Sequence, residues 1–299
     1  MAGITLKAPA KLNLTLEVLG RRPDGYHEVR TVLQAMDLAD RLTFGPADDL
    51  TLEVDPASTV SVADVPVEGN LVLEAARLLR QETGVEAGAL IKLYKRVPVA
   101  TGLGGGSSDA ATALLGLRRL WGVDIQERRL LDLAVRLGSD VPFFIRGGTA
   151  LGAGRGEELT TLPTPSQPWA VVLVPPDAPG PPKTARLYGL LTPAHYTAGP
   201  TATAEMVRRI SADEAFEECT VNVFDQVAAQ AYPGHERLRE AMRSASAGRV
   251  MLAGAGPSLF TLTPDRASAN RLEARLTAQG HSAYTARFLP AWSLDGLPA

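Results

Sequence analysis

A glycine-rich segment carries the strongest chemical signal in this 299-residue sequence: residues 98–111 read PVATGLGGGSSDAA. It lies between a predicted strand and a predicted helix. Glycine lets backbone N–H groups approach a ligand without interference from a Cβ atom, and the first N–H groups of a helix have no partner within it. Four glycines followed by two serines therefore predict an anion site suited to phosphate. The alternative is a flexible turn capped by Ser108.

Two familiar phosphate-binding loops do not fit this segment. A Walker A loop needs a lysine directly after its last glycine, and here Ser107 follows Gly106. A dinucleotide-binding fingerprint needs a third glycine where Ser107 stands, so a nucleotide-binding oxidoreductase is disfavoured.

Three shorter segments carry further candidates. Lys11, in APAKLNL, lies one residue off the apolar alternation, so we expect its ammonium to point away from the core; taken alone, it reads as a solvated surface lysine. Asp140, in GSDVPFF, precedes apolar residues, where a carboxylate needs a partner, although an N-cap role explains it equally well. Residues 252–258, LAGAGPS, read as a turn by themselves.

The elements that must position these residues follow from hydrophobic periodicity. Even-numbered apolar residues between Ile4 and Val18 predict a half-buried strand, and a turn at 20–25 follows it. Asn70 and Gly84 are the predicted cap and stop of a helix over 71–83. Further strands are expected at 28–36, 41–44, 50–54 and 89–97. Further helices are expected from near Asp109, at the end of the glycine-rich segment, to about Trp121, and over 126–137.

The second half begins where prolines concentrate, between residues 163 and 182. We place a domain junction near 150–165. Only 169–174 within the proline-rich stretch reads as a buried strand. Beyond it the pattern is α+β, with helices expected near 203–210, 220–231, 235–244 and 266–279, and strands near 249–253, 258–263 and 283–288.

Composition excludes several classes of protein. Thirty basic and thirty-three acidic side chains give a net charge of −3, so we expect no nucleic-acid partner and no attraction to anionic lipid. The single cysteine, Cys219, forms no internal disulfide, and the four histidines are scattered without zinc spacing. We find no long apolar run, so we expect neither a signal peptide nor a membrane span.

Together and in this order, the segments resemble the three motifs of the GHMP kinase superfamily, which match at 7–13, 98–111 and 252–260. Within it, RRPDGYHE at 21–28 and GSDVPF at 138–143 are similar to one family, the kinases that phosphorylate the 2-hydroxyl of 4-diphosphocytidyl-2-C-methyl-D-erythritol in non-mevalonate isoprenoid biosynthesis. The resemblance implies a cytoplasmic enzyme of bacterial type. Another small-molecule kinase of the superfamily, or a member that only binds ligands, remains an alternative.

The resemblance also implies a fold. It is an N-terminal α/β domain of ribosomal-protein-S5-like type over residues 1–155, followed by a ferredoxin-like α+β domain over 156–299. The resemblance also allows the last strand of the chain to pack with the first domain.

The resemblance assigns roles to individual residues. Asp140 is expected to act as the general base, with Lys11 keeping its carboxylate charged in a buried setting. ATP and Mg²⁺ are the expected co-substrate and ion, with Ser108 as the candidate metal ligand. The expected ATP contacts are Asn70, Leu71, Pro98, Val99, Ala100, Thr101, Gly102, Leu103, Gly104, Gly105, Gly106, Ser107 and Ser108. The expected contacts to the small-molecule acceptor are Asn13, Tyr26, His27, Thr184 and Tyr188, with the two tyrosines as stacking faces for cytosine.

Overall fold

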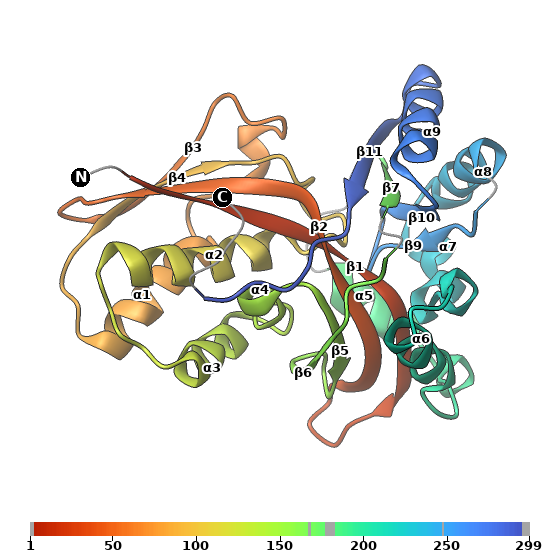
Figure 1. Ribbon diagram of the computed structural model, residues 1–299, viewed down its shortest axis with the longest axis horizontal. Helices are drawn as coiled ribbons and strands as arrows, with labels where there is room; N and C mark the ends of the chain where they lie inside the picture. The colour runs from red at the N-terminus through yellow and green to blue at the C-terminus, as the bar shows by residue number, and fades with distance from the viewer. Residues whose placement is uncertain (1–2, 167–168, 177–182, 247, 295–299) are drawn as a thin grey trace.

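A long antiparallel hairpin forms the spine of the molecule. In the computed structural model, which describes residues 3–166, 169–176, 183–246 and 248–294, strands β1 (Ile4–Arg21) and β2 (His27–Gly45) pair along nearly their whole length. Ile4 lies opposite Phe44 at one end, and Arg21 lies opposite His27 at the other. Figure 1 shows this hairpin in red to orange, running through both parts of the structure. It is therefore placed to contribute residues to a site between them.

The hairpin belongs to the larger of two sheets. The strand order is β3-β4-β2-β1-β8, and β5 pairs with both β2 and β6. The remaining strands of this sheet are β3 (Leu50–Val54), β4 (Ala89–Tyr94), β5 (Thr149–Ala153), β6 (Glu158–Leu162) and β8 (Val221–Asn222). Four helices lie on one side of it in Figure 1: α1 (Leu71–Thr83), α2 (Gly105–Leu120), α3 (Glu127–Leu137) and α4 (Phe143–Arg146).

The smaller sheet has the order β11-β7-β10-β9. Its strands are β7 (Trp169–Val174), β9 (Met251–Leu252), β10 (Leu259–Thr263) and β11 (Ser282–Arg287). The helices of this half are α5 (Lys183–Leu190), α6 (Thr201–Ser211), α7 (Ala228–Ala231), α8 (His235–Ala245) and α9 (Arg266–Ala278). After β11 the chain returns to the first sheet, where the Leu289 amide donates to the Ala35 carbonyl at 2.9 Å.

Several local signals are confirmed to the residue. Helix α1 spans the expected residues, the Asn70 side chain accepts from the Val72 amide at 3.0 Å, and Gly84 ends the helix with φ of +71°. Strands β3 and β7 match their predicted bounds. In each case the signal lies within one short stretch of chain, because caps and buried apolar runs act locally. The domain boundary after residue 155 stays a prediction.

Strand β1 corrects the expectation of a half-buried strand. It is buried on both faces from Ala8 to Val18. Leu12 and Leu14 pack with Val172 and other residues of the smaller sheet, while Ala8 packs in the core beneath α1 and α2. Burial of both faces places the polar residues of the opposite parity inside the protein, Lys11 and Asn13 among them.

Two expected strands differ in length from the prediction. The segments 28–36 and 41–44 form the single strand β2. The strand expected over 89–97 ends at Tyr94, because the amides of Arg96 and Val97 donate to the Asp40 side chain, at 2.6 and 2.8 Å, instead of extending the ladder.

Other boundaries were misplaced. Helix α2 starts at Gly105, earlier than the expected start near Asp109, so both serines lie inside it. The helix expected over 220–231 is wrong: a short strand, a 3-10 turn (Val223–Gln226) and α7 replace it. Asn222 is the physical reason, since its side chain accepts from the Phe224 amide at 3.0 Å and starts a new turn. The strand near 249–253 is reduced to β9. Residues 177–182 of the proline-rich stretch, with three of its prolines, lie outside the described residues.

Candidate active site

One cavity of about 1040 Å³ lies between the glycine-rich segment and the tip of the β1–β2 hairpin. It is lined by every residue that the sequence predicted for catalysis, nucleotide and acceptor, with the exception of Ser108. These residues come from β1, the hairpin turn, the start of β2, the start of α1, the loop before α2, the first turn of α2, the turn before α4, and α5. The tertiary structure therefore brings together segments that are up to 177 positions apart, from Lys11 to Tyr188.

The N-terminus of α2 forms the nucleotide end of this cavity. Gly104 stands at the N-cap with φ of +75° and has no side chain to cap the helix. The first helical hydrogen bond runs from the Ser108 amide to the Gly104 carbonyl at 2.9 Å, so the amides of residues 105–107 precede it. The first turn carries no acidic residue. Such a helix end, with free N–H groups and a positive dipole end, attracts anions.

Two neighbouring glycines of this turn have different surroundings. A Cβ on Gly105 would lie 3.0 Å from Val97 Cγ1 and 3.2 Å from Lys95 Nζ, so Gly105 faces the protein. A Cβ on Gly106 would have nothing within 4 Å. Since Gly106 also lines the cavity, it is the glycine whose missing side chain leaves room for a ligand.

The three motif segments meet at Lys11. The Lys11 amide donates to the Leu103 carbonyl at 2.9 Å, and a Cβ on Gly254 would lie 3.0 Å from Lys11 Nζ. The loop that contains Gly254 is held by Asn222, whose amide nitrogen donates to the carbonyls of Leu252 and Gly254 at 2.9 and 2.8 Å. The sequence analysis missed this role of Asn222. An amide side chain between apolar residues, in VNVF, was the available signal.

Lys11 and Asp140 form the expected pair across the cavity wall. Lys11 Nζ lies 3.5 Å from Asp140 Oδ2. The Lys11 side chain is 5% exposed, which rules out a solvated surface lysine. The Asp140 side chain is 41% exposed, so the expectation of a buried carboxylate is wrong. The ammonium is therefore the buried partner, and the carboxylate faces the cavity.

Asn13 holds the lysine in place. Its Oδ1 accepts from Lys11 Nζ at 2.6 Å, and its Nδ2 donates to Thr31 Oγ1 at 2.8 Å. The Asn13 side chain lines the cavity but is almost fully buried. Its established contact is thus with Lys11, and its predicted contact with the acceptor stays a prediction.

A buried network that the sequence analysis missed supports the nucleotide end. Lys95 Nζ donates to Asp40 and, at 2.8 Å, to Asp109 Oδ2, and all three residues are at most 3% exposed. Burial raises the pKa of Asp109 to about 8, although Lys95 opposes the shift. Burial alone would lower the pKa of Lys95. The two neighbouring carboxyl groups have the larger effect, and the pKa of Lys95 is raised to about 12. The network ties the end of β4 to β2 and to the second turn of α2. A polar residue at a buried strand position, Asp40, was the available signal.

Ser108 is not on the cavity wall. Its side chain is fully buried, and its Oγ has no hydrogen-bond partner among the described residues. The Ser108 side chain therefore lies behind the cavity wall, although its amide donates to the Gly104 carbonyl in the same turn. Asn70 does line the cavity, and its side chain also caps α1 and donates to the Pro66 carbonyl at 2.8 Å.

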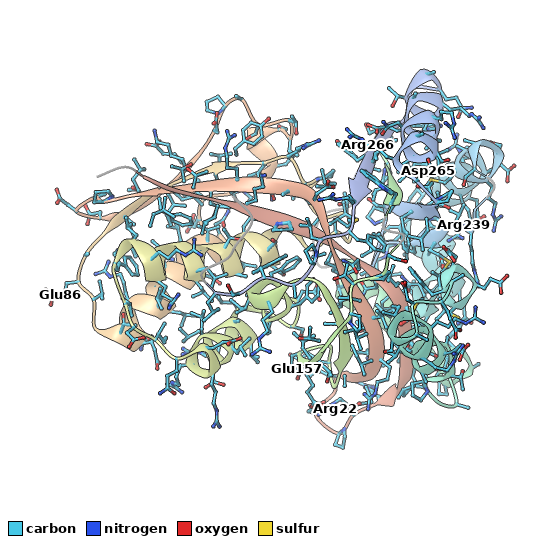
Figure 2. All side chains as sticks on the ribbon, in the orientation of Figure 1. Arg22, Glu86, Glu157, Arg239, Asp265 and Arg266 are labelled. Atoms are coloured by element: carbon cyan, nitrogen blue, oxygen red, sulfur yellow. The ribbon has the colours of Figure 1, made fainter. Side chains whose placement is uncertain are left out.

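The hairpin turn and the turn between β5 and β6 meet at the acceptor end. Tyr26 is 56% exposed, and the Arg155 guanidinium lies 4.8 Å from the centre of its ring. Arg155 Nε also donates to Glu157 at 3.0 Å. Figure 2 labels Arg22 and Glu157, which mark these two turns at the lower edge of the view. One face of Tyr26 is therefore covered by a cation.

Tyr188 lies deeper and is surrounded by rings. His27 stacks on it with centroids 4.7 Å apart and an interplanar angle of 21°, and Phe224 meets it edge-on at 4.9 Å. Burial and the nearby Asp140 raise the Tyr188 pKa. The two predicted stacking faces, Tyr26 and Tyr188, are thus each in contact with another side chain. Thr184, one helical turn earlier in α5, is exposed and lines the same end.

Comparisons with known proteins place these features in a family. A model of the GHMP kinases N terminal domain matches residues 70–148, and a model of the GHMP kinases C terminal domain matches residues 204–282. A 4-diphosphocytidyl-2-C-methyl-D-erythritol kinase of Symbiobacterium thermophilum is 43% identical over 287 residues, covering 95% of this chain and 99% of that protein. A protein of the same name from Dehalococcoides mccartyi is 42% identical over 281 residues, covering 94% and 96%.

Solved structures agree with the sequence comparison. A crystal structure of 4-(cytidine 5'-diphospho)-2C-methyl-D-erythritol kinase matches with a TM-score of 0.77 and 33% identity, covering 95% of this chain and 99% of the other. A homoserine kinase from Cytophaga hutchinsonii matches with a TM-score of 0.74 at 16% identity, covering 98% and 96%, which supports the fold alone. The predicted fold class is confirmed. Within the described residues, no helix is both long and apolar enough to cross a membrane.

Proposed function

The chain belongs to the GHMP kinases and, among them, to the 4-diphosphocytidyl-2-C-methyl-D-erythritol kinases, and from this we infer that the cavity described above binds ATP and the acceptor side by side, with Lys11 and Asp140 between them. The protein is an ATP-dependent kinase of non-mevalonate isoprenoid biosynthesis. The observation that carries the site assignment is the 3.5 Å pair of Lys11 Nζ and Asp140 Oδ2 on the wall of that cavity.

Asp140 is the proposed general base. Its carboxylate is open to the cavity and takes the proton from the acceptor's 2-hydroxyl. The hydroxyl oxygen forms a bond to the γ-phosphorus as the bond from that phosphorus to the bridging oxygen breaks. ADP leaves with the electron pair. Because phosphoryl transfer is mainly positioning and charge stabilisation, the catalytic task of the chain is to hold these groups in line.

Lys11 supplies positive charge where the reaction develops negative charge. Its ammonium is buried and hydrogen-bonded to Asn13, so its position is set before any ligand binds. An ammonium held in place in this way costs no reorganisation during the reaction.

The N-terminus of α2 is the proposed site of the ATP phosphates. The amides of residues 105–107 and the open space above Gly106 support this placement. The neighbouring Asn70 and Leu71 are the proposed contacts of the adenine.

Mg²⁺ is proposed as an ion that arrives with the nucleotide. The described residues hold no group of three or more His, Cys, Asp or Glu side chains that would form a metal site. This fits Mg²⁺, which keeps several waters and takes substrate phosphates with one or two protein oxygens. Ser108 Oγ is unpartnered but fully buried behind the cavity wall, so the ion is proposed to reach this turn of α2 through its water ligands. When bound, the ion neutralises phosphate charge.

The test replaces Asp140 by Asn and measures ADP release and ATP binding. We expect kcat to fall by about 10²- to 10⁴-fold, the usual loss on removal of a general base, with ATP affinity nearly unchanged. Asp132→Asn, an exposed carboxylate on α3, is the matched control and should leave kcat unchanged. A D140N enzyme that keeps more than about a tenth of wild-type kcat would exclude Asp140 as the base.

Two further measurements sharpen the assignment. Lys11→Met should also lower kcat, and the double variant should be little worse than the worse single variant, because residues that act as a unit are not additive. Wild-type protein should release ADP with the diphosphocytidyl acceptor, but neither with mevalonate nor without an acceptor. Turnover of mevalonate instead would favour another kinase of the superfamily.

A further inference from the structure

Tyr196 contacts the acceptor end of the cavity from a segment that the proposed function does not use. Its hydroxyl lies 3.3 Å from His27 Nε2, and its ring meets the His27 ring edge-on at 5.9 Å and 71°. His27 in turn stacks on Tyr188. All three rings line the cavity. Within the described part of the chain, this hydroxyl is the hydrogen-bond partner found for the His27 side chain.

The backbone around Tyr196 is held on both sides. Before it, a 3-10 turn (Pro193–His195) is closed by a capping box in which the Thr192 amide donates to His195 Nδ1 at 2.9 Å. After it, the Thr197 amide donates to the Val18 carbonyl at 2.9 Å. The tyrosine therefore approaches His27 from a segment anchored on β1, the strand that also carries Lys11.

The state of His27 makes this contact informative. Burial and the neighbouring Arg21 lower the pKa of His27, which favours the neutral ring. A neutral imidazole has one N–H donor and one acceptor nitrogen, and the hydrogen bond at one nitrogen decides which is which. A phenol that donates to Nε2 leaves the proton on Nδ1, which is then the free donor.

We propose that Tyr196 is a positioning residue for acceptor binding, which holds the His27 imidazole against Tyr188 and fixes its proton on Nδ1. The proposal rests on the proposed function, since it takes this end of the cavity as the place of the acceptor's base. Tyr196 acts through His27 and needs no contact with the reacting atoms. The consequence is that its hydroxyl affects acceptor affinity and leaves the chemical step alone.

The first test is Tyr196→Phe, which keeps the ring and removes the hydroxyl. The KM for the acceptor should rise by about 2- to 12-fold, the equivalent of one net hydrogen bond, while kcat and the KM for ATP stay within a factor of two. Tyr284→Phe is the matched control, because Tyr284 lies on β11, does not line the cavity and should change neither KM. An unchanged acceptor KM in Y196F would overturn the proposal. A wild-type enzyme that does not use the acceptor would overturn the proposed function instead.

The second test asks whether Tyr196 acts through His27. In a His27→Ala background, Tyr196→Phe should cause no further rise in acceptor KM. An equal rise in both backgrounds would mean that Tyr196 contacts the acceptor independently. Nitrogen NMR of histidine-labelled protein gives a readout without turnover, with the four histidines distinguished by His27→Gln. We expect the Nδ1–H form of His27 in the wild type and its loss in Y196F. The same tautomer in both proteins would contradict the proposal.

Discussion

The two ends of the cavity are built in different ways. The nucleotide end is made from backbone: the open N-terminus of α2 and glycines that admit close neighbours. The acceptor end is made from side chains that arrive from β2, α5 and the turn before α6, and it has two covered ring faces, on Tyr26 and Tyr188. A phosphate needs N–H groups that every residue type provides, whereas a base needs rings of particular shape.

The residues packed behind the two ends of the cavity also differ in kind. Behind the nucleotide end lies the fully buried network of Asp40, Lys95 and Asp109. Behind the acceptor end lies a ring cluster in which Tyr188 is packed but Tyr26 is mostly exposed. Charge supports the first end and aromatic packing supports the second. Substitutions at the two ends should therefore separate stability, ATP affinity and acceptor affinity.

The largest effect is expected from Lys95→Met. Removing the ammonium leaves the buried Asp40 and Asp109 side chains without the donor and positive charge that they share, and breaking a buried pair in this way costs about 3–5 kcal/mol. Urea unfolding of the protein without nucleotide measures this loss. Lys92→Met is the matched control: Lys92 lies on β4, three residues before Lys95, is 57% exposed and pairs with Glu53 at 3.6 Å, so it should cost less than about 1 kcal/mol. Equal losses in the two variants would show that the network does not support this end.

A smaller effect, confined to ATP, is expected from Gly106→Val. The added side chain meets no protein atom within 4 Å of its Cβ but enters the space above the α2 amides. The KM for ATP should rise by about 100-fold, near 2.7 kcal/mol, with the melting temperature and the acceptor KM little changed. Gly45→Val, also in open space but away from the cavity, should change none of these.

Gly105→Val differs from both of these variants, because its side chain would press on Val97 and Lys95. It should therefore lower stability together with ATP affinity. If Gly106→Val instead lowered stability and left ATP affinity unchanged, the glycine-rich segment would be a simple turn and not a phosphate site.

The smallest effects are expected at the acceptor end. Tyr188→Ala removes a stacking ring and should raise the acceptor KM by about 5- to 150-fold, or 1–3 kcal/mol, while the KM for ATP stays unchanged. Tyr188→Phe keeps the ring and serves as its control. Tyr26→Ala should cost less, because that ring is 56% exposed. If Tyr26→Ala raises the acceptor KM and Tyr188→Ala does not, the second stacking face is another residue. If neither does, cytidine binding at this end is wrong.

The chain's own order of residues determined most of the nucleotide end. Asn70 and Gly84 predicted the bounds of α1, and the glycine-rich segment predicted a phosphate site at the start of a helix. These features could be read directly because a cap, a stop and a helix N-terminus each depend on a few consecutive residues. The start of α2 was misplaced by a few residues because glycine and serine are compatible with both a loop and a first turn.

The tertiary structure alone decided the electrostatics and the acceptor end. By itself, Lys11 read as a solvated surface lysine, and it is buried because the loops that contain Gly104 and Gly254 lie against its side chain. The pairing of Lys95 with Asp40, and of His27 with Tyr188, joins residues 55 and 161 positions apart. No local propensity encodes such contacts, because they depend on strand register and on which faces of distant elements pack together. Consecutive residues thus determined the backbone of the nucleotide end, and packing between distant elements determined where the charged and aromatic side chains of the cavity lie.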